Sequence, residues 1–270
     1  MRAERAADDG FASSLVPGLK ASADAARLSD ELAFSAARLA RLATDPPGVY
    51  ADIASEADVE EATWLAFLTA YLAPLEGDDP FAAIRSAPVR WASGSLPDLA
   101  EVATGPRSAH DPARGDRTLA AYRAWASRSG SQQAAFTGDA SWTPERRFAR
   151  VFERLSLPGF HRAARFDLLT TLGRLGVYDV RADALHFGTG DDAELAAKRV
   201  FGIGDRALLE RRAADLADAA DVPIDALDLA LYNWGRAPRP RVVAGVVATA
   251  DESAAARIRS ELGVAASATA

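Results

Sequence analysis

The sequence has no cysteine in its 270 residues. This absence excludes disulfides, thiolate nucleophiles, cysteine-based zinc sites and iron–sulfur clusters. Lysine is nearly absent as well, because Lys20 and Lys198 are the only two, so almost every basic side chain is an arginine. The three histidines, His110, His161 and His186, share no metal-ligand spacing. We therefore expect no metal site and no cofactor, and no nucleophile-elbow pattern for Ser/His/Asp hydrolysis is present.

Long apolar runs are also missing, and no run reaches the 18 residues that a transmembrane helix needs. The first ten residues are charged and contain no apolar core of a signal peptide, so we expect a cytoplasmic protein without a membrane partner. Valine and isoleucine are sparse whereas alanine is abundant, which favours helices over sheets. The composition thus predicts a helical protein, and a hydrophobic content of 49% allows a sizeable core.

Apolar spacing together with start and stop signals predicts an all-α, two-lobed helical bundle. The clearest start is Thr143-Pro144-Glu145, an N-cap followed by proline and an acid. Residues 86–116 and 130–141 are predicted as loops, and Val242–Val247 is the one strand-like run, so at most one short strand pair is expected. Helices are predicted over residues 28–42, 58–72, 79–84, 116–128, 144–155, 161–175, 192–201, 205–219, 223–234 and 251–262.

This pattern suggests three parts of the chain. Residues 1–27 are small, polar and charged, which is typical of a flexible N-terminal arm. Residues 28–236 form the main helical domain, and residues 237–270 form a C-terminal extension with one helix.

The charge is acidic overall but not evenly spread. The formal net charge is −7, yet residues 144–212 carry 13 basic and 10 acidic side chains. Such a locally basic stretch could track a phosphate backbone, or it could be a solvated helix face paired with Glu145, Glu153 and Asp167. The arginines concerned are Arg146, Arg147, Arg150, Arg154, Arg162 and Arg165.

A Gly-x-Gly turn, Gly202-Ile203-Gly204, joins two predicted helices. Glycine permits a positive φ and leaves backbone N–H groups uncovered, so this turn and the following helix start can hold a phosphate. Lys198, Arg199 and Arg206 flank the turn and could add charged contacts. The alternative is an ordinary short connection between helices.

The spacing downstream of the turn resembles the helix-hairpin-helix DNA glycosylase superfamily. Val200-Phe201-Gly202-Ile203-Gly204 matches its hairpin, and Val222-Pro223-Ile224-Asp225 matches the step that opens a later helix in that family. The match is good over residues 190–236 and extends loosely back to residue 28. Thymine-modifying pyrophosphorylase-like and hydroxymethyluracil DNA kinase helical families, distant branches of the same fold, are also consistent with it.

The resemblance implies a C-terminal helix-hairpin-helix, binding to double-stranded DNA with a modified base, and chemistry at its N-glycosidic bond. Asp225 falls on the family's catalytic aspartate, which stabilises a developing cationic sugar or orients water. Arg206 stands where bifunctional members carry a lysine nucleophile, and because guanidinium is a poor nucleophile, a monofunctional enzyme is implied. Ala226-Leu227 replaces the Thr-His that often follows the aspartate.

Four further residues are candidates for a base pocket: Asp228, Trp234, Gln132 and Gln133. Asp228 lies one helical turn beyond Asp225, where two acids could raise one pKa or could both be solvated. Asp225 itself could simply be an acid stabilised by its helix dipole. Trp234 could stack on a base or pack in the core. A rival to catalysis is a helical protein that kept this fold only to bind nucleic acid or another protein.

Overall fold

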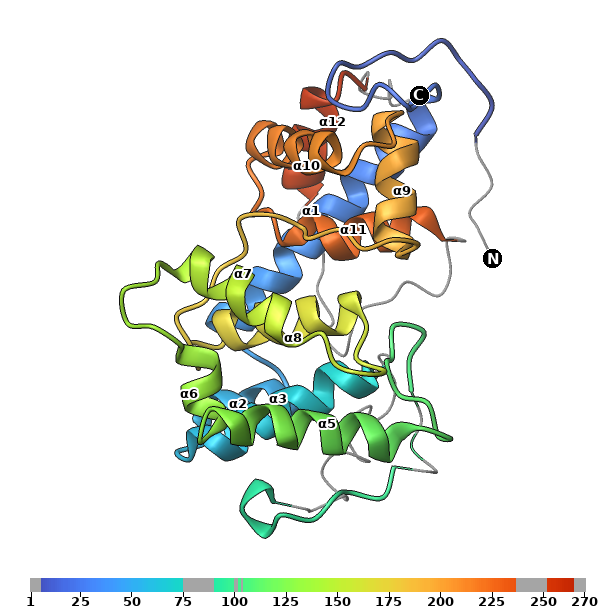
Figure 1. Cartoon of the computed structure of the whole chain (residues 1–270). Coiled ribbons are helices and arrows are strands. Elements are labelled where there is room, and N and C mark those ends of the chain that lie inside the picture. Colours follow the sequence, from blue (N-terminus) through green and yellow to red (C-terminus); the bar gives the residue numbers. More distant parts are fainter. Residues whose placement is uncertain (1–5, 75–89, 100–101, 103, 237–251, 265–270) are drawn as a thin grey trace. The chain divides into compact units, whose positions relative to one another are not determined.

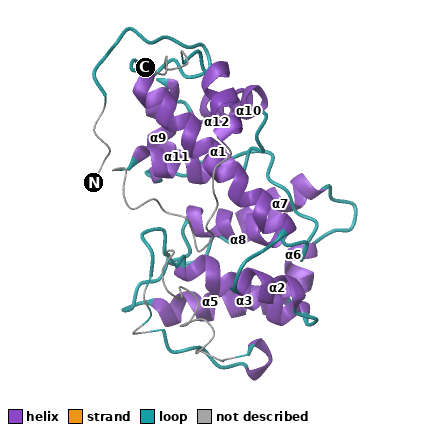
Figure 2. Ribbon diagram, turned by 180° about the vertical axis from the view of Figure 1, so that it is seen from behind, coloured by secondary structure: helices purple, strands orange, loops and turns teal. Residues whose placement is uncertain are grey.

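The structure, a computed structural model, describes residues 6–74, 90–99, 102, 104–236 and 252–264 (Figure 1). The described residues form eleven α-helices and one 3-10 helix, and none of them forms a strand, which confirms the all-α prediction (Figure 2). The elements are α1 Ser22–Thr44, α2 Val49–Ser55, α3 Val59–Leu72, η1 Trp91–Ser93, α5 Gly115–Arg128, α6 Gln132–Thr137, α7 Pro144–Arg154, α8 Arg162–Arg174, α9 Asp192–Phe201, α10 Arg206–Ala220, α11 Ala226–Gly235 and α12 Glu252–Glu261.

Most predicted helices are confirmed, and their local signals act as expected. Thr143 caps α7 by accepting the Arg146 N–H, and Asp58 caps α3 by accepting the Glu60 N–H. Two short helices, α2 and α6, were not predicted, and α6 lies within the predicted loop 130–141. The predicted helix 79–84 and the strand-like run Val242–Val247 lie outside the described residues.

The chain divides into two compact units, each described here by itself. The terminal unit comprises residues 6–40, 183–236 and 252–264, and the central unit comprises the described residues of 41–182. In the terminal unit, α9 packs against α11 and α10, and α10 also contacts α12. Its core consists of Leu28, Leu32, Val200, Phe201, Leu209, Leu216, Leu227, Leu231, Trp234 and Ile258.

The central unit is built around α3, which contacts α2, α6, α8 and η1. The helix is apolar on nearly all sides, and ten of its fourteen residues are buried. An aromatic cluster fills this unit, with the rings of Phe67 and Tyr122 stacked 3.7 Å apart. Arg123 lies over Trp64 and Trp91 and donates to the Trp91 carbonyl at 3.0 Å, which attaches η1 to the same cluster.

The N-terminal stretch is closely attached to the terminal unit. Val16 and Leu19 are buried, α1 begins at Ser22, and the Gly18 N–H donates to the Val200 carbonyl at 2.9 Å. A Cβ atom on Gly18 would lie 2.1 Å from the Arg199 carbonyl oxygen and 2.6 Å from the Gly202 nitrogen. Glycine is therefore required here because two backbones approach each other at the end of α9.

Replacing Gly18 with Ala is expected to destabilise the protein by about 1–3 kcal/mol, because the added methyl group meets backbone atoms that cannot rotate away. Chemical denaturation would measure this loss. The matched control is Gly204→Ala, because a Cβ on Gly204 meets no heavy atom within 4 Å. Equal stability of the two variants would show that the close approach at Gly18 contributes nothing.

Candidate functional site

Helices α9 and α10 are joined by the short turn that the Gly-x-Gly pattern predicted. Gly202 ends α9 in the left-handed region, with a φ of 67°, and its N–H donates to the Lys198 carbonyl at 3.0 Å. Asp205 begins α10 as its N-cap, and its carboxylate accepts the Leu208 N–H at 2.9 Å. Both ends of the bend are thus fixed by local chemistry.

The turn is open to solvent on one side. Gly202 and Gly204 are exposed and Ile203 is partly exposed. The other side is covered, since a Cβ on Gly202 would lie 3.2 Å from the Gly18 Cα. The open side leaves room for a ligand to approach the backbone closely at Gly204.

Lys198 and Arg206 converge on one acid near this turn. The Lys198 Nζ lies 3.3 Å and the Arg206 Nη2 lies 3.5 Å from the same oxygen, Oε1 of Glu194. The other oxygen of Glu194 accepts the Gly190 N–H at 3.1 Å. The sequence analysis missed Glu194, although an acid four residues before Lys198 on one helix is the usual spacing of a stabilising pair.

The structure brings Arg199 and Trp234 together. The Arg199 guanidinium lies 4.8 Å from the Trp234 ring centroid, and Arg27 lies 5.2 Å from it. Trp234 is only 1% exposed and its indole N–H donates to the Asp24 carbonyl at 2.9 Å. The geometry favours core packing for Trp234 over stacking on a base.

Asp225 and Asp228 lie at the start of α11, and both are buried, with 8% and 1% of their surfaces exposed. The interpretation of two solvated acids is therefore wrong. Asp225 occupies the N-cap position of α11, yet its side chain makes no capping hydrogen bond to the N–H groups of that helix. Helix capping alone thus does not explain a buried acid at position 225.

The glutamine pair lies in the central unit and begins α6, so its predicted place in a loop is wrong. The Gln132 and Gln133 N–H groups donate to the Glu60 carboxylate at 3.0 and 2.7 Å. The Gln132 side chain is buried and accepts the Tyr122 hydroxyl at 2.6 Å. Burial raises the pKa of Tyr122 well above its ordinary value, so the phenol keeps the proton that it donates.

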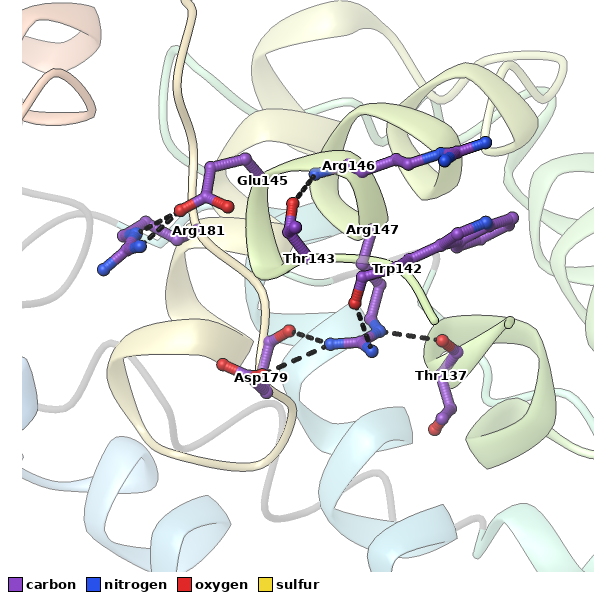
Figure 3. A network of polar contacts seen from close by, with 8 residues as sticks. All are labelled: Thr137, Trp142, Thr143, Glu145, Arg146, Arg147, Asp179 and Arg181. Carbon is purple, nitrogen blue, oxygen red and sulfur yellow. Dashed lines mark hydrogen bonds and ion pairs between the residues drawn. The ribbon is translucent and has the colours of Figure 1, made fainter. Parts of the chain in front are cut away.

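Part of the basic stretch is committed to internal contacts, and Figure 3 shows this for Arg147. Arg147 is buried and donates to the carbonyls of Thr137 and Trp142 at 2.8 and 3.1 Å. Arg165 lies over the Phe152 ring, whereas Arg150 pairs with Glu153 at 3.3 Å, as expected for a solvated face.

Two of the expected partners of this stretch pair elsewhere. Glu145 binds Arg181, whose hydrogen bonds lower the pKa of that carboxyl, and Asp167 binds Arg107. The stretch is therefore not one continuous basic face.

The described residues contain no group of three or more His, Asp or Glu side chains that could hold a metal ion. His110 instead contacts the Tyr71 hydroxyl at 3.1 Å and the Leu99 carbonyl at 3.0 Å, and His161 contacts the Ser108 carbonyl. Among the described helices, none is long and apolar enough to cross a membrane.

Comparison with known proteins gives one match. The family model of alpha-glutamyl/putrescinyl thymine pyrophosphorylase clade 3 matches residues 107–244, just over half of the chain. The chain belongs to this family. No curated protein and no solved structure matches it.

The family match corrects the resemblance drawn from the sequence. The thymine pyrophosphorylase family is a thymine-modification family, one of the branches named above, and the match gives no support to cleavage of an N-glycosidic bond. The matched range includes the Gly202–Gly204 turn, the acid Glu194 and both buried aspartates of α11. All of these belong to the terminal unit, whereas Gln132 and Gln133 belong to the central unit.

Proposed function

We propose that this protein modifies thymine in DNA by joining an amine to the base with release of pyrophosphate. The observation that carries the proposal is membership in a family described as alpha-glutamyl/putrescinyl thymine pyrophosphorylases. The buried acids at the start of α11 and the exposed Gly-x-Gly turn lie within the matched range and supply the kinds of group that such chemistry needs.

The proposed reaction needs an activated base, because the methyl group of thymine does not react with amines. A diphosphate ester on a 5-hydroxymethyl group provides the leaving group. The nitrogen of putrescine or the α-amino group of glutamate forms a bond to the exocyclic carbon. The carbon–oxygen bond breaks with its electron pair going to pyrophosphate, and the amine nitrogen loses one proton.

Asp225 is the residue that we assign to this step. A carboxylate beside the exocyclic carbon can stabilise positive charge as pyrophosphate departs, and it can accept the proton from the attacking amine. Its 8% exposure supports the assignment, because electrostatic stabilisation is stronger where water is excluded. Asp228, one turn further on and buried, is assigned a supporting position in the same acid pair.

The turn between α9 and α10 is assigned to the DNA backbone. Exposed backbone amides at a helix start favour an anion, and Lys198 and Arg206 add positive charge beside them. Because the protein carries a net charge of −7, binding must rely on such local positive charge. Affinity for DNA is expected to fall steeply as salt rises.

Gly204→Ala gives a direct prediction for this turn. A methyl group there meets no protein atom within 4 Å, so the stability of the protein is expected to stay unchanged. A phosphate that contacts the turn would be pushed away, and we expect DNA affinity to fall by about tenfold, which is the loss of roughly one hydrogen bond to a charged group. Fluorescence anisotropy with labelled DNA and a thermal melt would measure the two effects. Unchanged affinity would remove the turn from the DNA interface.

The decisive experiment offers the protein DNA that contains the diphosphate ester of 5-hydroxymethyluracil, single-stranded and double-stranded, with putrescine or glutamate. The expected result is pyrophosphate release together with a modified nucleoside whose mass includes the amine. No release with either amine on either form of DNA would contradict the proposed reaction. Salt-dependent DNA binding without any reaction would instead favour the rival, a helical protein that only binds nucleic acid.

A further inference from the structure

The buried carboxylate of Glu194 connects two cations that come from different helices. Glu194 is 2% exposed and lies in the first turn of α9, whereas Lys198 lies one turn on and Arg206 begins α10 beyond the hairpin turn. Arg206 also donates to the Thr189 hydroxyl at 2.9 Å. The acid therefore ties the two helices of the hairpin together through their cations.

Lys198 and Arg206 together carry more positive charge than is required to neutralise the buried carboxylate of Glu194. A buried carboxylate is unfavourable unless it is paired and hydrogen-bonded, and one cation together with the Gly190 N–H would satisfy that need. Two cations on one oxygen leave the cluster with one unit of positive charge.

Both cations keep access to solvent. The Lys198 side chain is 37% exposed and the Arg206 side chain is 50% exposed. Ammonium has three N–H donors and guanidinium has five, so both groups retain donors that Glu194 and Thr189 do not use. These free donors are available to an outside anion.

We infer that Glu194 is a positioning residue that holds Lys198 and Arg206 together as a preformed pair for a phosphate of the DNA backbone. Long cationic side chains lose rotamer freedom when they bind, and a pair that is already held in place avoids much of that cost. The carboxylate also offsets the repulsion between the two cations. This inference rests on the proposed function, because it assumes that the hairpin contacts DNA.

Glu194→Gln separates positioning from simple charge. The substitution removes a negative charge, so charge alone predicts tighter binding of DNA. Positioning predicts the opposite, because a neutral amide does not hold two cations, and we expect affinity for a labelled duplex to fall by about fivefold. Affinity that is equal or higher in the variant would overturn the inference while leaving the proposed function intact.

The matched control is Asp215→Asn on α10. Asp215 pairs with Arg212 at 4.0 Å with both side chains about half exposed, so the variant removes the same charge from a surface pair in the same unit. Its affinity for DNA is expected to stay equal or rise slightly. A fivefold loss in this control as well would also overturn the inference, since no positioning role exists there.

A second set of variants tests whether Glu194 acts through the two cations. In a Lys198→Gln/Arg206→Gln background, Glu194→Gln is expected to leave affinity equal or slightly higher, as charge alone predicts, and a persisting loss would overturn the inference by indicating a merely structural role. If Glu194→Gln fails to fold, Lys198→Gln and Arg206→Gln, made singly and together, still test the inference. A preformed pair predicts that the double variant loses less free energy of DNA binding than the sum of the two single losses. Strict additivity would overturn the inference, and absence of DNA binding by the unaltered protein would overturn the proposed function itself.

Discussion

Asp225→Asn is expected to lower the rate of pyrophosphate release by about 10²- to 10³-fold, because asparagine keeps the volume but removes the charge that the reaction uses. The amide cannot accept a proton from the amine or stabilise positive charge at the exocyclic carbon. Single-turnover rates with the activated oligonucleotide would measure this loss. Affinity for the same DNA is expected to change little, since the turn assigned to the backbone is untouched.

The control for this variant is Asp221→Asn, four residues earlier in the chain. Asp221 ends α10 with a φ of 51°, a conformation that asparagine adopts readily, and its side chain is 88% exposed beside Arg257. The control is expected to keep the full rate. A rate for Asp225→Asn equal to that of the control would remove Asp225 from the reaction and leave a buried structural acid.

Arg147→Ala is expected to cause the largest loss of stability, about 3 kcal/mol, because it removes a buried guanidinium and the hydrogen bonds by which that group joins three segments. The Arg147 guanidinium donates to carbonyls at the end of α6, before α7 and in the segment after α8, where Asp179 also contributes its carboxylate at 3.4 Å (Figure 3). Three segments of the central unit thus lose a shared anchor. Thermal or chemical denaturation would measure the change.

The neighbouring Arg146 provides the control within the same helix. Arg146 is exposed, and the bond that it makes to the Thr143 hydroxyl uses its backbone N–H, which alanine retains (Figure 3). Arg146→Ala is expected to change stability by less than about 0.5 kcal/mol. Similar losses in the two variants would mean that the Arg147 hydrogen bonds contribute no more than a surface side chain does.

Helix ends were predictable where the responsible residues lie within a few positions of one another. Thr143 before Pro144 begins α7, and Gly202 followed by Asp205 bends the chain between α9 and α10, as their sequence signals predicted. The short helix α6 was missed because six residues carry little intrinsic helix preference. Ser131 caps this helix locally by accepting the Ala134 N–H, and its start is also held by the carboxylate of Glu60, which is 72 and 73 residues away in sequence from the amides that it binds.

The candidate site also contains features that the sequence predicted and features that it did not. The sequence located the turn, Asp225 and the flanking cations, and it led to a resemblance that included the thymine pyrophosphorylase branch. It also suggested glycosidic chemistry, because the hairpin and the aspartate mark a fold that several chemistries share. The family match assigns the chain to a thymine-modification family.

The sequence by itself determined the helical class, the absence of cysteine chemistry and the bend at Gly202, because composition, caps and turns depend on residues that are neighbours along the chain. Only the tertiary structure decided that Arg199 lies on Trp234, that Glu194 binds Arg206, and that Gly18 meets the end of α9. These contacts join residues whose approach depends on how helices pack, and packing is set by the shape and volume of many side chains together.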